Sequence, residues 1–214
     1  MARLKNGILG GIQGVVGNVE GYVRNGEYYI RSRRRKTTKP PSEKQLACRK
    51  KLVVVNDFLG SFVPYVQVGF AFAAAGKTCD GYNLATSYHI KNAIAGQYPD
   101  YTIDYTKVKL TEGPIDNGNI NAAVTLQDNR LIFTWTPDFS YTHSRDRVML
   151  LAYSPAFNEA VYTLCGASRI TGTDMLVLPD DTWNGTVIEV YFSFVSENRK
   201  SCTNSLYLGQ ILTK

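Results

Sequence analysis

The residues best suited to chemistry in this sequence are cations rather than a catalytic set. Guanidinium groups bind phosphates through a planar, bidentate fork, and aromatic rings nearby can stack on bases. Tyr22 and Tyr29 are candidate aromatic contacts of this kind. The candidate polyanion-binding residues are Arg31, Arg33, Arg34, Arg35, Lys36 and Lys39, which Pro40 and Pro41 follow, together with Arg49 and Lys50 further along.

Charge is divided unevenly along the chain. Residues 1–51 hold thirteen Lys or Arg against three Glu, a net charge of +10, whereas residues 52–214 hold eleven against fifteen acids, a net charge of −4. A basic block on an acidic body indicates a polyanion partner or a head-to-tail contact between copies. The alternative is a solvated run of charge that only aids solubility.

Catalytic and metal-binding patterns are weak. The two histidines, His89 and His143, have no recognisable nucleophile motif beside them. The four cysteines have no CxxC or Cys/His spacing, so we expect them to be reduced. Asp100 with Asp104, or Asp180 with Asp181, are candidates for a glycosidase pair or a metal site, and Asp116 with Asn117 and Asn119 are candidate oxygen ligands for a hard cation. None has the required motif, and we predict no enzyme, no cofactor and no metal.

A glycine-rich β-hairpin is predicted before the cations. Glycines crowd residues 7–21 without a dinucleotide or phosphate-loop motif, which is typical of a bent strand that another backbone approaches closely. Asn25-Gly26 then lies between two alternating runs and favours a two-residue turn. That turn pairs Tyr22 with Tyr29 and Glu20 with Arg31, and it places Val19, Val23, Tyr28 and Ile30 together on the other face.

Helices are predicted next, over a segment of residues 42–100. Ser42 and Gln45 have the spacing of a capping box, which opens a helix that reaches Phe58 or Leu59 and carries Arg49 and Lys50. A second helix is expected near 62–75. A third is expected near 84–94, with Gly96 just past its end.

From Tyr101 onward the hydrophobic period changes to two, and turn residues recur about every ten positions, as in a β-sandwich. The fold class is therefore α+β. Three parts are expected: a basic arm with its hairpin (1–41), the helical segment (42–100) and the sandwich (101–214). The strands are expected near 103–110, 122–127, 130–136, 147–153, 160–165, 174–178, 186–195 and 204–212.

Two resemblances accompany these patterns. Leu131 to Trp135, followed by Pro137, then 148–153 and 187–195, resemble a fibronectin type III or immunoglobulin-like module. The whole chain resembles a family of uncharacterised proteins found mostly in Bacteroidota, a domain of unknown function, which implies no activity or catalytic residue. The resembling positions are 7–11, Gly14, 16–18, Arg31-Ser32, Gln45 with Arg49, 68–70, 91–94, 98–101 and 205–210. Relatives carry one Arg where this chain has Arg33-Arg34-Arg35-Lys36, which favours a polyanion partner for this member.

The function predicted from these features is structural. We expect a protein that self-associates as an oligomer or filament and whose basic arm contacts nucleic acid, another polyanion or a neighbouring subunit. The alternative is a carbohydrate- or protein-binding module that uses the sandwich loops, with Trp183 and Tyr141 as candidate aromatic anchors. For Trp183, packing over the open end of the sandwich is expected as readily as exposure on a turn. With no signal peptide or membrane span recognised in the sequence, we expect the protein in the cytoplasm, or released without a cleaved signal.

Overall fold

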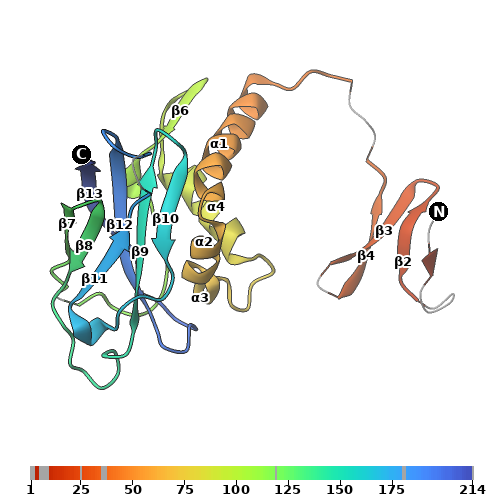
Figure 1. Cartoon of the computed structure of the whole chain (residues 1–214). Helices are drawn as coiled ribbons and strands as arrows, with labels where there is room; N and C mark the ends of the chain where they lie inside the picture. The colour runs from red at the N-terminus through yellow and green to blue at the C-terminus, as the bar shows by residue number, and fades with distance from the viewer. Residues whose placement is uncertain are drawn as a thin grey trace. The chain divides into compact units, whose positions relative to one another are not determined.

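The computed structural model describes residues 3–4, 10–24, 26–34, 38–118, 120–179 and 182–213. The chain divides into two compact units, Met1–Ser42 and Glu43–Lys214. The first is called the arm here and the second the body (Figure 1). The helical segment expected to stand apart thus belongs to the same compact unit as the sandwich.

The arm is one antiparallel sheet of four strands in the order β1-β2-β3-β4. The strands are β1 (Arg3–Leu4), β2 (Ile12–Val16), β3 (Val19–Arg24) and β4 (Glu27–Ser32). Between β3 and β4 the register pairs Tyr22 with Tyr29 and Glu20 with Arg31, which are the pairs expected from the sequence. Of the two expected turn residues, Asn25 lies outside the described residues, and Gly26 has a φ of 84°.

Helices α1 (Glu43–Gly60), α2 (Val63–Gly69), α3 (Ala71–Ala74) and α4 (Gly81–Asn92) begin the body. Helix α4 starts earlier than expected because Asp80 caps it, accepting a hydrogen bond from the Asn83 amide at 2.8 Å. Gly96 does not follow a helix. It lies in β5 (Ile94–Gln97), which pairs with β6 (Asp100–Ile103), so the expectation of Gly96 as a helix end was wrong.

Two further sheets complete the body. One has the order β10-β9-β12-β13 and the other β11-β8-β7. Their strands are β7 (Ala123–Gln127), β8 (Arg130–Thr134), β9 (Arg147–Ser154), β10 (Glu159–Thr163), β11 (Thr173–Val177), β12 (Val187–Val195) and β13 (Leu206–Leu212). Short 3-10 helices, η2 (Tyr105–Lys107) and η3 (Arg169–Thr171), interrupt the connections.

The central strands β9 and β12 are buried along almost their whole length because each sheet face has a core. On one face, Leu150 and Phe192 pack against the second sheet. On the other face, Leu151 and Tyr191 pack against the helical layer. Phe58 of α1 and Phe62 in the turn after α1 belong to the same core. The body therefore has three layers, helices, a four-stranded sheet and a three-stranded sheet, as Figure 1 shows.

No single helix in the described part of the chain is long and apolar enough to span a membrane; α1 and α2 meet the length and composition criteria only as a pair, bent by 94°.

Candidate interaction surfaces

One face of the arm sheet carries charges and tyrosines. The rings of Tyr22 and Tyr29 stack with centroids 5.7 Å apart. The Arg31 guanidinium lies 5.1 Å from the Tyr22 ring centre and donates to Glu20 Oε2 at 2.8 Å. These contacts hold Arg31 within the sheet, where Glu20 offsets its charge.

The other expected cations of the arm follow β4. Arg33 and Arg34 are exposed, and the Arg33 amide donates to the Asn18 carbonyl at 2.7 Å, which continues the β3–β4 ladder. Arg35 and Lys36 lie outside the described residues. Lys39 is exposed in the connection to the body.

Arg49 and Lys50 lie on α1, exposed, and belong to the body rather than the arm. The boundary after Ser42 changes the division of charge: counted over the two units, the arm has a net charge of +7 and the body −1. The contrast between a basic block and an acidic remainder is therefore smaller than the sequence division at residue 51 indicated.

The opposite face of the arm sheet is apolar and uncovered. We call it the apolar face and define it as Val16, Val19, Val23, Tyr28 and Ile30, whose exposed fractions run from 40% to 64%. Gly11 and Gly21 let the chain at the start of β2 lie close to β3 and β4, because a side chain at Gly11 would overlap the Tyr28 ring and one at Gly21 would meet the Ile12 carbonyl. Even so, Gly21 is the only buried residue among those described in the arm.

In the body, the two candidate aromatic anchors differ in how exposed they are. Trp183 is buried in the sandwich core, which agrees with the packing alternative and not with an exposed anchor. Tyr141 is fully exposed in the connection between β8 and β9. Trp135 is 4% exposed and packs against Phe192 and Phe194 in the sandwich core.

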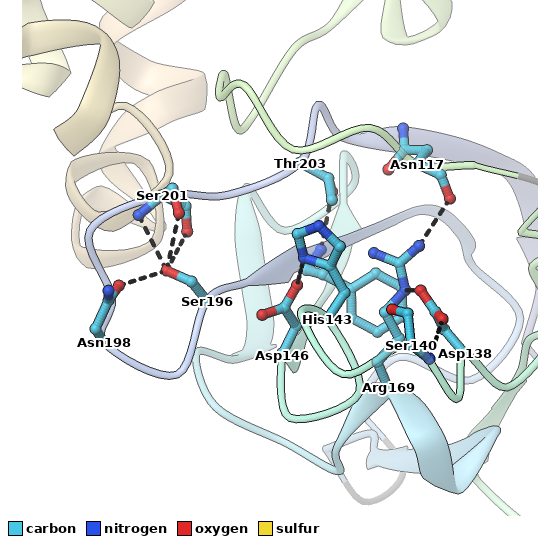
Figure 2. Close-up of polar contacts among 11 residues, drawn as sticks. Asn117, Asp138, Ser140, His143, Asp146, Arg169, Ser196, Asn198, Ser201 and Thr203 are labelled. Atoms are coloured by element: carbon cyan, nitrogen blue, oxygen red, sulfur yellow. Dashed lines mark hydrogen bonds and ion pairs between the residues drawn. The ribbon is translucent and has the colours of Figure 1, made fainter.

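Arg169 organises the loops at the Tyr141 end of the sandwich. Its guanidinium is buried, lies 4.9 Å from the Phe194 ring centre, and is held by Asp138 Oδ2 at 3.2 Å and by the Asn117 carbonyl at 3.1 Å (Figure 2). The amide of Ser140 donates to Asp138 Oδ1 and lowers the pKa of that carboxyl, with Arg169 adding to the effect. Arg169 thus joins three segments far apart in sequence.

His143 and Asp146 form a second polar pair there, with His143 Nδ1 3.0 Å from Asp146 Oδ2 (Figure 2). The Asp146 side chain is buried, and that burial raises the pKa of its carboxyl despite the contact with His143. A histidine oriented by an aspartate supplies two of the three members of a nucleophilic triad. In the described part of the chain, however, no hydroxyl or thiol is hydrogen-bonded to Nε2 of His143.

The second histidine, His89, is part of the helical core. Its Nδ1 lies 2.7 Å from the Ala85 carbonyl, so the neutral ring donates there, and burial lowers the pKa of His89 to about 4. The described residues contain no group of three or more His, Cys, Asp or Glu that could hold a metal ion. Of the acidic and amide residues named above as candidates, Asp104 accepts a hydrogen bond from Thr106 and forms an ion pair with Lys107 in a local turn. Asp180, Asp181 and Asn119 lie outside the described residues.

Sequence reasoning missed the Arg169 and Asp146 contacts. Each residue is a single charge in a stretch without a motif, and its burial depends on segments far away in the chain. The local signal that existed was Asp138 two residues before Ser140, a spacing typical of a turn closed by an aspartate side chain.

Comparison with known proteins gives a family but no activity. No curated protein matches the sequence. A solved structure of the chicken CNTN1 FN1–FN3 domains is similar at 14% sequence identity and a TM-score of 0.30, over 53% of this chain and 35% of that one. The chain thus spans about a third of that structure's length. The family match, described as a family of unknown function (DUF6266), covers residues 11–209, and the chain belongs to that family.

Proposed function

We propose that this is a non-enzymatic assembly protein whose arm binds the body of a second copy. The observation that carries the proposal is the apolar face, because a four-stranded sheet without a buried side chain in its described part has no core of its own. Sheets this small need a packed hydrophobic face for stability, and contiguous exposed apolar patches mark interaction sites. Full burial of an exposed aliphatic side chain contributes roughly 1.5–3 kcal/mol; Val23 and Ile30 are 40% and 64% exposed, so covering them with a partner would contribute part of that for each.

The partner surface we infer is strand β11. Met175 and Val177 are each more than half exposed, lie two residues apart, and so point to the same side of that strand. Strand β11 is an edge of its sheet, and exposed apolar edges pair readily with other chains. An arm-to-body contact between copies is heterologous, and repeating it gives rings or filaments.

The basic stretch supports a second part of the proposal, contact with a polyanion. Arg33 and Arg34 are exposed and follow β4 directly, whereas Arg31 is engaged by Glu20. Nucleic acid bound through such side chains is held by its phosphates and without sequence preference. The strand orders of the body also support the finer proposal that its two sheets form a fibronectin type III-like sandwich.

The assembly proposal is tested by light scattering on size-exclusion fractions of Val23→Thr/Ile30→Thr. Threonine keeps the β-branched shape that suits a strand but removes apolar surface. We expect the double variant to be monomeric at concentrations where the unaltered chain associates, while Glu27→Gln on the opposite face associates normally. If the double variant associates as the unaltered chain does, the apolar face is not the contact.

A body variant, Met175→Thr/Val177→Thr, identifies the partner surface. If it is monomeric too, the arm of one copy binds β11 of the next. If it still associates while the arm variant does not, the arms pair with each other and the assignment of β11 is wrong.

A further inference from the structure

A recess of about 620 Å³ opens at the Tyr141 end of the sandwich. It lies between the connection from β8 to β9, which supplies Tyr141, Ser144 and Asp146, and the connection from β12 to β13, which supplies Ser196 and Asn198. Figure 2 shows Asp146 with His143 on one side and the loop of Ser196, Asn198 and Ser201 on the other. Its volume falls within the roughly 300–1,000 Å³ of small-molecule sites.

Both walls are ordered by the protein's own hydrogen bonds. In the first, Ser144 donates its amide to Ser140, and its carbonyl accepts from Ile170 at 3.2 Å. In the second, Ser196 Oγ lies 2.7 Å from Asn198 Oδ1 and 2.9 Å from the Ser201 carbonyl. A recess that is already shaped loses little conformational entropy when a ligand binds.

The groups that face the recess are polar and of both hydrogen-bonding kinds. Asp146 Oδ2 accepts from His143, while Oδ1 has no hydrogen bond to another described residue and remains an acceptor. Ser144 has a hydroxyl, and the Asn198 amide nitrogen adds donors. None of the lining side chains is aliphatic, so a peptide finds no pocket for the apolar anchor that such contacts require.

The charges of the residues that line the recess limit the class of ligand further. The lining residues include Asp146 and Glu197 against a single cation, Arg145, which lies 3.9 Å from Glu197 across the mouth. The net negative charge disfavours phosphates, sulfates and acidic sugars. A neutral, polyhydroxylated ligand meets no such repulsion.

The rim supplies aromatic surface. Tyr141 is 100% exposed, and Phe139 nearby in the sequence is 77% exposed. Exposed aromatic rings beside a polar recess offer a flat apolar surface on which a ligand can pack. The C–H face of a pyranose ring provides such a cover, while its hydroxyls reach the polar groups below.

We propose that this recess binds a neutral oligosaccharide, with Tyr141 stacking on a sugar ring and Asp146 and Asn198 bonding its hydroxyls. The site is independent of the assembly contact, since it uses no residue of the arm or of β11.

The test is affinity electrophoresis of the full chain through gels that contain neutral polysaccharides, namely β-glucan, α-glucan, mannan and xylan, followed by calorimetric titration with oligosaccharides of any that retards it. Tyr141→Ala is expected to weaken binding about ten-fold or more, as loss of a stacking contact of this kind does. Asp146→Asn, which can still accept from His143, is expected to weaken it similarly.

Phe157→Ala is the matched control, because Phe157 is also an exposed aromatic but lies at the other end of β9. We expect it to bind as the unaltered chain does. A further gel containing polygalacturonate tests an acidic polysaccharide. Retardation by none of the neutral polysaccharides, equal binding by Tyr141→Ala and Phe157→Ala, or retardation by polygalacturonate alone would each overturn the proposal.

Discussion

The indole N–H of Trp135 donates to the backbone carbonyl of Arg169 at 2.8 Å. This bond links the sandwich core to the loop cluster, because Trp135 packs on Phe192 and Phe194 and Arg169 also lies against the Phe194 ring. We therefore expect a substitution in either the core or the loop cluster to change the stability of both.

Replacing Trp135 with Ala should destabilise the body by about 3–5 kcal/mol, the usual cost of a large-to-small change in a core. Trp135→Phe should cost less, since it keeps an aromatic filler and loses mainly the bond to Arg169, which is worth about 1–3 kcal/mol. Urea unfolding of both variants measures these differences. A urea midpoint of Trp135→Ala equal to that of the unaltered chain, with the same slope, would contradict the assignment.

Stability should fall on acidification through His89. The pKa of His89 is lowered from 6.5 in the unfolded chain to about 4 in the folded one, so the unfolded chain takes up the proton first. The stabilisation is complete above pH 6.5 and is lost as the pH falls to about 4, a change of roughly 3 kcal/mol. His89→Leu removes the titration, and its stability should change less between these pH values. Identical pH profiles for the two proteins would exclude this role.

Asp138→Asn should loosen the loop cluster, because it removes the carboxylate that compensates the buried Arg169. Removing one partner of a buried pair costs up to about 3–5 kcal/mol, and less here because Asp138 is partly exposed. Arg169→Met removes the buried charge itself, so the double variant should be no less stable than Asp138→Asn alone. Chemical unfolding of the three variants gives the comparison. Purely additive losses would mean that the two side chains do not stabilise each other.

If the arm binds nucleic acid, affinity should depend on salt rather than on sequence. With Arg31 held by Glu20, five phosphate contacts from Arg33, Arg34, Arg35, Lys36 and Lys39 give a slope of log K against log salt of about −4.5, and replacing the three arginines with Ala should reduce its magnitude by about 3. Titration of labelled duplex DNA at several salt concentrations measures the slope. No binding at low salt would show that protein carboxylates already neutralise these arginines, in which case the triple variant should dissociate assemblies in the absence of DNA.

Much of the body's secondary structure followed from the local sequence. Strands near 130–136, 147–153 and 186–195 were predicted within one or two residues because their apolar runs are bounded by clear turns. The β5–β6 pair was missed. Residues 94–97 follow the helical pattern directly, so no strand was predicted there. The strand expected near 103–110 was wrong: it overlaps β6 only at Ile103, and Tyr105–Lys107 form the 3-10 helix η2, which Asp104 caps by accepting from the Thr106 amide.

The candidate sites were harder to predict. The arginine run was visible as composition, but the pairing of Arg31 with Glu20 depended on strand register, which the Asn25-Gly26 turn supplied. Trp183 beside Asn184-Gly185 has the local pattern of an exposed turn, and only the packing of distant strands buries it. The recess depends on two loops about fifty residues apart, which no local pattern connects.

The central claim is that the arm holds copies together. Sedimentation velocity of the full chain, compared at equal concentration with a chain that starts at Ser42, tests it most directly. The account predicts concentration-dependent species larger than a monomer for the full chain and a single monomer for the shorter one. Equal, monomeric sedimentation of both chains would contradict it.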